Sequence, residues 1–232
     1  MFRGKVSVSL DVWGDFACFT QSDAKVERVS YLIPTPSACR GILEAIYAKP
    51  VEFMYQITGI DVINPIKTIS IKKNEVTRKA AAGRKKKSIE QIIVEDNRTQ
   101  RNTIYLKDVY YRISADIMIR AETDHRVNAE KVWKEFTNRI AKGKCFYQPY
   151  LGNRECMCFF APVDESKSPI QDSRDMGIML YDIFDPRSIE PLDTEKRTGK
   201  TQVTYYHPYM INGHISVPVY DSPEVFGRKE EG

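Results

Sequence analysis

Two segments with helical periodicity, at residues 35–50 and 128–143, most constrain what this chain can fold into. In each segment apolar residues recur three and four positions apart, so one side of each predicted helix must be buried. The two apolar stripes consist of Cys39, Ile42, Leu43 and Ile46, and of Ala129, Val132, Trp133, Phe136 and Ile140. The residues at the ends of these segments also indicate helices, because Thr35 and Asn128 are good N-cap residues and Gly143 suits a helix end.

Strand-like sequence surrounds both predicted helices. Residues 5–12 alternate between apolar and polar, and other runs are rich in β-branched and aromatic residues. These runs are residues 51–66, 103–120 and 154–161. The order strand, helix, strand, strand, helix, strand is the split βαβ or ferredoxin-like pattern, which RNA-recognition modules also use. We predict an α+β protein with a ferredoxin-like (RRM-like) domain over residues 1–162, interrupted by a basic insertion at about 68–102.

The last part of the chain has a different pattern. A short apolar run at residues 175–186 predicts a strand, and residues 187–202 are charged and predict a loop. Asn212-Gly213 lies between two apolar runs, and this dipeptide is a strong sign of a β-hairpin. We therefore predict a smaller, β-rich C-terminal domain over residues 163–232.

Composition excludes several classes of protein. Apolar runs are shorter than the ~18–20 residues that cross a bilayer, and the N-terminal sequence has no signal-peptide core. We therefore expect a cytoplasmic protein without a membrane partner. The five cysteines are odd in number and form no Cys-x-x-Cys pair, which favours core thiols over disulfides or a zinc site. We expect neither a metal nor a cofactor.

Positive charge is concentrated in residues 72–87. This stretch contains eight Lys or Arg and one acid, Glu75, so its net charge is +7, whereas the whole chain is +4 and the remainder is therefore −3. The basic residues are Lys72, Lys73, Arg78, Lys79, Arg84, Lys85, Lys86 and Lys87. Such a field favours a nucleic-acid partner, and the alternative is a solvated loop without a partner.

A metal-free ribonuclease is compatible with the sequence. In that chemistry the substrate's own 2′-hydroxyl attacks the adjacent phosphate, while the protein positions the strand, stabilises charge and moves protons. Tyr47 and Lys49 at the end of the first helix, and Lys131 in the first turn of the second, suit these tasks. The alternative is that Tyr47 packs in the core and Lys131 is solvated.

Several runs, in this order, resemble one known family. They are VWGDFACFT, KVERVSYLIPTPSACRGILEAIYAKP, KKNEV, RNTIYLKDVYY, YLGNREC and DMGIMLYDI. Together they look like the CRISPR-associated endoribonuclease of subtype I-C, the d-type member of the Cas-five family. The resemblance implies a protein that binds the CRISPR repeat stem-loop and cuts precursor RNA at the 3′ base of the stem without metal. It also implies that the protein stays on the 5′ handle, beside the backbone and large subunits of the Cascade complex.

The same resemblance assigns roles to individual residues. The family's active-site tyrosine corresponds to Tyr47, and the lysine of its Lys-His pair corresponds to Lys131. The histidine position is Val132, which cannot transfer a proton, and His125 is a candidate substitute or else an exposed loop histidine.

Three functions remain open from the sequence. The first is endoribonuclease activity, with Arg40, Lys49 and Lys134 holding neighbouring phosphates. The second is a binding and assembly subunit that grips RNA without cutting it. The third is binding of duplex DNA through the basic insertion, with steep salt dependence.

Overall fold

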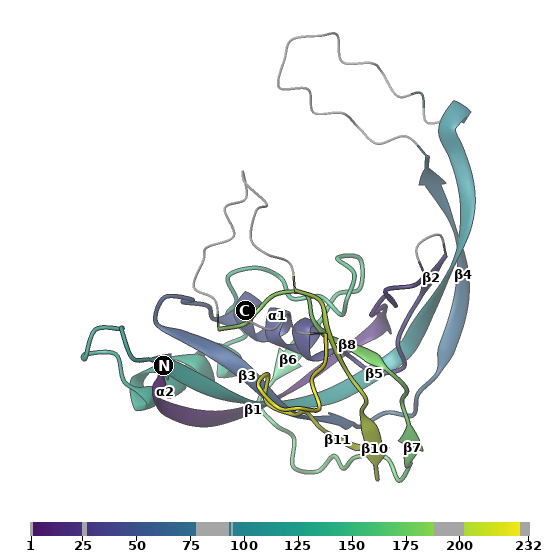
Figure 1. Ribbon diagram of the computed structural model, residues 1–232. Coiled ribbons are helices and arrows are strands. Elements are labelled where there is room, and N and C mark those ends of the chain that lie inside the picture. The colour runs from purple at the N-terminus through teal and green to yellow at the C-terminus, as the bar shows by residue number, and fades with distance from the viewer. Residues whose placement is uncertain (1, 25–26, 78–92, 94, 188–201, 228–232) are drawn as a thin grey trace, which may run out of the picture.

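The computed structural model describes residues 2–24, 27–77, 93, 95–187 and 202–227 and is mostly β with two α-helices (Figure 1). The helices are α1 (Pro36–Ile46) and α2 (Ala129–Ala141), with a short 3₁₀ helix η1 (Glu95–Asn97). The strands are β1 (Phe2–Ala17), β2 (Arg28–Val29), β3 (Phe53–Val62), β4 (Thr68–Val76), β5 (Arg98–Arg120), β6 (Phe159–Ala161), β7 (Arg174–Asp175), β8 (Met179–Asp182), β9 (Thr204–Tyr206), β10 (Tyr209–Ile211) and β11 (His214–Ser216).

The main sheet has the strand order β6-β1-β5-β3-β11-β10-β7, and neighbours along this path are antiparallel. The strands that alternate with the helices, β6-β1-β5-β3, lie in the order that the predicted split βαβ arrangement requires. Strand β5 is 23 residues long, and its N-terminal half also pairs with β4 and, in parallel, with β2. Figure 1 shows β4 and this half of β5 as a curved ribbon that extends away from the helices.

Both predicted helices are confirmed, together with their N-caps. The Thr35 side chain accepts a hydrogen bond from the backbone N–H of Ala38 (3.2 Å), and Asn128 accepts one from Lys131 (2.9 Å). The stripe predicted for α1 is buried throughout. In α2 the prediction was wrong for Trp133, which is 40% exposed. The buried stripe is Val132, Phe136 and Ile140, which are four residues apart, so Trp133 points to the side of it.

The hairpin predicted at Asn212-Gly213 is confirmed, since it joins β10 to β11 and both residues have positive φ, 47° and 77°. Strand β11 pairs with β3, so strands from residues 163–232 continue the main sheet, and one hydrophobic core includes residues from both parts of the chain. The division of the chain near residue 162 stays a prediction. The short strands β8 and β9 form a separate two-stranded sheet.

One predicted strand boundary was wrong. The strand expected at 154–161 is only Phe159–Ala161, because the chain before it turns, with Leu151 N–H donating to the carbonyl of Cys156 (2.8 Å). The basic insertion at about 68–102 stays a prediction, and within it Thr68–Val76 forms strand β4, a strand that was not predicted and whose side chains alternate in exposure. The remainder of the insertion, residues 78–92 and 94, lies outside the described residues.

The cysteines and the helices of the described residues can also be compared with the sequence predictions. The cysteines are all free, and four are buried while Cys145 is half-buried, as the sequence predicted. Within the described part of the chain, no helix combines the length and apolar character needed to span a membrane.

Candidate nucleic-acid interface

Tyr47 lies at the C-terminal end of α1, where extended backbone turns the chain toward β3. Its side chain is only 5% exposed. The ring packs against Phe53, with centroids 5.2 Å apart, and stacks on Phe146 at 6.4 Å. The Arg139 guanidinium, from α2, lies 5.0 Å from the Tyr47 ring centroid and 4.5 Å from that of Phe146. The tyrosine therefore sits in an aromatic cluster that carries a cation.

The electrostatics around Tyr47 keep its hydroxyl protonated. Burial raises the pKa of Tyr47 above its ordinary value of 10.0, although the ammonium of Lys49 acts in the opposite direction. Lys49 in turn forms an ion pair with Glu52 (2.9 Å), and this contact raises the pKa of Lys49. At neutral pH the cluster thus offers a neutral phenol beside an ammonium group, which suits donation of hydrogen bonds to an anion.

Along the axis of α2, Lys131 lies away from the point at which Tyr47 contacts this helix. Tyr47 contacts Arg139, which follows Lys131 by eight residues, and at 1.5 Å per residue this places Lys131 roughly 12 Å further along the helix. The Lys131 ammonium donates to the backbone carbonyl of Arg126 (3.1 Å) at the start of α2. The two predicted catalytic residues therefore do not form one compact group.

His125 lies in the loop between β5 and α2. Arg3 donates to its Nδ1 (3.0 Å) and to the carbonyl oxygens of Asp124 and Val127 (both 2.6 Å). Because arginine only donates, the ring proton of neutral His125 belongs on Nε2. His125 is exposed, and the carbonyl of the next residue, Arg126, accepts a hydrogen bond from Lys131. A substitute catalytic role for His125 stays a prediction. Val132 is 3% exposed and belongs to the core.

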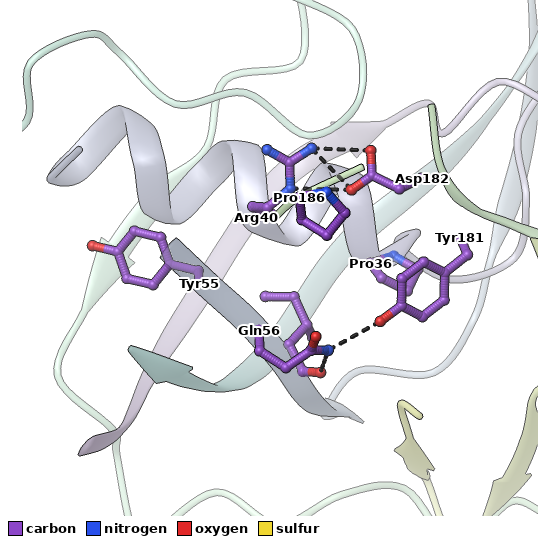
Figure 2. Close-up of a pocket in the computed structure, with 8 residues that line it drawn as sticks. Pro36, Arg40, Tyr55, Gln56, Tyr181, Asp182 and Pro186 are labelled. Atoms are coloured by element: carbon purple, nitrogen blue, oxygen red, sulfur yellow. Dashed lines mark hydrogen bonds and ion pairs between the residues drawn. The ribbon is translucent and has the colours of Figure 1, made fainter. Parts of the chain in front are cut away.

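Arg40, predicted from the sequence to hold a phosphate, is engaged by two carboxylates in the structure, and its phosphate role stays a prediction. Its guanidinium donates to both carboxylate oxygens of Asp182, at 2.9–3.1 Å, and to Glu44 at 2.8 Å. Figure 2 shows Arg40 and Asp182 facing each other above a small hollow that Tyr55, Gln56 and other side chains line. The side chains of Arg40 and Asp182 are 18% and 4% exposed, so the pair joins α1 to β8 inside the protein. Sequence periodicity does not show this partner, because it lies 142 residues away.

Lys134, also predicted to hold a phosphate, is exposed on α2 and forms an ion pair with Glu130 (2.6 Å). Such a surface pair is weak and is readily exchanged for another anion.

The two described lysines of the basic stretch lie on opposite faces of the β4–β5 ribbon. Lys73 forms an ion pair with Glu155 (2.5 Å) and lies over the ring of Tyr105. Lys72 is exposed, and no ion pair joins it to another residue of the described ranges. The other predicted RNA-binding residues, Arg78, Lys79, Arg84, Lys85, Lys86 and Lys87, lie outside the described residues.

We expect Lys72→Ala to reduce the salt dependence of RNA binding by about one phosphate contact, because each neutralised phosphate contributes a slope of roughly 0.7–0.9. Lys73→Ala is the matched control, since Glu155 already compensates its charge. Affinity for repeat RNA, titrated at several salt concentrations, measures both slopes. Equal slopes for the two variants would contradict the expectation that RNA contacts Lys72 and not Lys73.

Sequence reasoning missed Arg139 and Phe146, which contact Tyr47, and Tyr147, which follows Phe146 in the chain. A signal for them exists, because residues 139–154 contain four Lys or Arg and no Asp or Glu. This second basic stretch is the less conspicuous one, because its charges are spread among aromatic and apolar residues.

Comparisons with known proteins decide the family. A family model described as CRISPR-associated protein (Cas_Cas5), for the Cas5d group, matches residues 7–218. The chain belongs to the Cas5d family. The CRISPR pre-crRNA endoribonuclease Cas5d of Thermus thermophilus is 36% identical, with 97% of this chain and 96% of the relative covered. The protein of the same name from Mannheimia succiniciproducens is 37% identical, with 94% and 97% covered.

A solved structure shows the same fold. The crystal structure of a CRISPR-associated protein matches with a TM-score of 0.67 and 22% identity, and the match covers 97% of this chain and 99% of that chain. The extended sheet with its two helices is therefore shared with a CRISPR-associated protein of similar length.

Proposed function

We propose that this Cas5d-family protein is a metal-independent endoribonuclease that cleaves CRISPR repeat stem-loops in precursor RNA. It would then remain on the 5′ handle of the product as a subunit of a type I-C Cascade complex, in contact with the backbone and large subunits. The observation that carries the proposal is the cluster around Tyr47, where a buried neutral phenol lies beside Lys49 and Arg139. The names of the two relatives support the same reaction class.

In this reaction the 2′-oxygen attacks phosphorus, the bond to the 5′-oxygen breaks, and a 2′,3′-cyclic phosphate forms. The 2′-hydroxyl loses a proton and the departing 5′-oxygen gains one. Because the pKa of Tyr47 is raised, its hydroxyl is suited to orient the 2′-oxygen or to donate to the phosphate, and not to act as a phenolate base. Lys131 suits phosphate binding, because it lies where the N-terminal N–H groups of α2 favour an anion. The strand would run along α2 to meet both groups.

A cleavage assay in EDTA tests the proposal directly. Purified protein and repeat RNA should give one cut that leaves a 2′,3′-cyclic phosphate, and RNA with a single 2′-deoxy substitution at the cut nucleotide should bind but remain intact. Binding of unmodified repeat RNA without any cleavage would exclude the enzyme.

A second candidate function is that of an RNA-binding Cascade subunit with little or no nuclease activity. The observation that favours it is Val132, an apolar core residue at the position where the family resemblance places a histidine. Guide production that is unchanged by Tyr47→Phe would support this alternative.

A further inference from the structure

We infer that Phe146 and Tyr147 form a stacking site for an unpaired RNA base beside Tyr47. The inference deepens the proposed function, because it names the part of the substrate that the protein holds next to the candidate cleavage site. Phe146 is 53% exposed and Tyr147 is 79% exposed, although large aromatic side chains gain free energy from burial.

The backbone fixes both residues firmly. The N–H groups of Phe146 and Tyr147 donate to the same carbonyl, that of Ala45 in the last turn of α1, at 2.8 and 3.2 Å. Carbonyls in a last helical turn lack partners within the helix, so this contact satisfies an otherwise open acceptor. The exposed rings therefore belong to a segment tied to α1, which is the kind of preorganised surface that favours binding.

A cation is already stacked on one of these rings. Arg139 lies 4.5 Å from the centroid of Phe146 and is held by Glu135 (2.7 Å) and by the carbonyl of Ile46 (3.3 Å). A guanidinium above an aromatic ring offers a flat, polar surface beside it, although Glu135 compensates part of the charge of Arg139. Phe146 also stacks on Tyr47, so a base at this site would adjoin the candidate catalytic hydroxyl.

The surrounding charge favours RNA over a protein partner. Lys142 and Lys144 are exposed and precede the aromatic pair by a few residues, and the whole 139–154 stretch carries no acidic residue. Exposed aromatic rings combined with cations are typical of surfaces that bind single-stranded nucleic acid, where bases stack and phosphates meet Lys or Arg. The alternative is that these rings form a protein-docking surface, and the test must distinguish this alternative from RNA binding.

The test uses repeat RNA with a 2′-deoxy substitution at the cut nucleotide, so that binding is measured independently of cleavage. 2-Aminopurine is placed in turn at each unpaired position that flanks the stem. We expect wild-type protein to quench the fluorescence at one position. Tyr147→Ala should abolish that quenching and weaken RNA binding by about 5–100-fold, as expected for loss of one stacked base. Tyr147→Trp should restore both.

Tyr209→Ala is the matched control, because Tyr209 is also exposed (57%) but lies on β10, away from the helices. Unchanged RNA affinity and quenching in Tyr147→Ala would overturn the inference, and loss of binding to a partner subunit instead would identify a protein-docking surface. If wild type binds RNA without cutting unmodified RNA, the proposed nuclease fails, while the quenching result still decides the stacking site.

Discussion

Replacing Tyr47 with phenylalanine should slow cleavage of repeat RNA by roughly 10²–10⁴-fold, the range typical for loss of one proton-donating or proton-transferring group. Phenylalanine keeps the ring that packs on Phe53 and Phe146, so the fold and RNA affinity should be preserved. Single-turnover kinetics with excess protein separate the two effects. Tyr209→Phe makes the same chemical change at an exposed site and should cleave normally. Normal cleavage by Tyr47→Phe would remove Tyr47 from the mechanism.

The pH dependence provides a second readout of the same residue. Burial raises the pKa of Tyr47 above 10.0, so its hydroxyl remains protonated throughout the range from pH 7 to pH 9. A role as hydrogen-bond donor therefore predicts no Tyr47-dependent fall in rate over this range. If wild type became faster toward pH 9 and Tyr47→Phe did not, a phenolate base would be indicated instead.

Arg40→Ala should destabilise the protein by about 3–5 kcal/mol, because it leaves the Asp182 carboxylate buried without its cation. Burial alone would lower the pKa of Arg40, but Asp182 and Glu44 together raise it, which shows that the guanidinium is held as a cation. Unfolding in urea, followed by circular dichroism, measures the change in free energy. RNA affinity per folded molecule should remain near that of wild type.

Lys134→Ala is the matched control for Arg40→Ala. It also removes a cation from an ion pair, but both partners are largely exposed, with side chains 65% and 70% accessible, so little stability should be lost. A variant of Arg40 that folds normally yet loses RNA affinity would restore the phosphate-binding role predicted from the sequence.

The sequence was sufficient for those elements whose signals are local. The helix at Pro36–Ile46 and the turn at Asn212-Gly213 each depend on a few neighbouring residues, and both were predicted correctly. Strand β4 was missed because its charged residues hide an alternation that is visible only in exposure. Polarity along an exposed ribbon indicates a loop and a strand equally well.

In the candidate site, too, local signals were readable from the sequence and long-range contacts were not. Tyr47 was proposed from its residue type and position and from a family resemblance, whereas its neighbours Arg139 and Phe146 come from a helix and a loop about 90–100 residues further along the chain. The charge of Arg40 suggested a phosphate partner, and only the fold brings Asp182 next to it. Long-range ion pairs and stacked rings are properties of the folded state, so spacing within one segment cannot reveal them.

The pairing of β1 with β5 has a consequence for synthesis of the protein. Phe2 lies opposite Arg120, and Ala17 lies opposite Leu106, so β1 must wait for residues that a ribosome adds roughly 100 positions later. At about 5–20 residues per second, this delay is on the order of 5–20 s. During that time the β1 segment, which alternates between apolar and polar residues, has open backbone groups that are available for pairing with other nascent chains. The yield of folded protein should therefore depend on the rate of translation and on chaperones that cover the first strand.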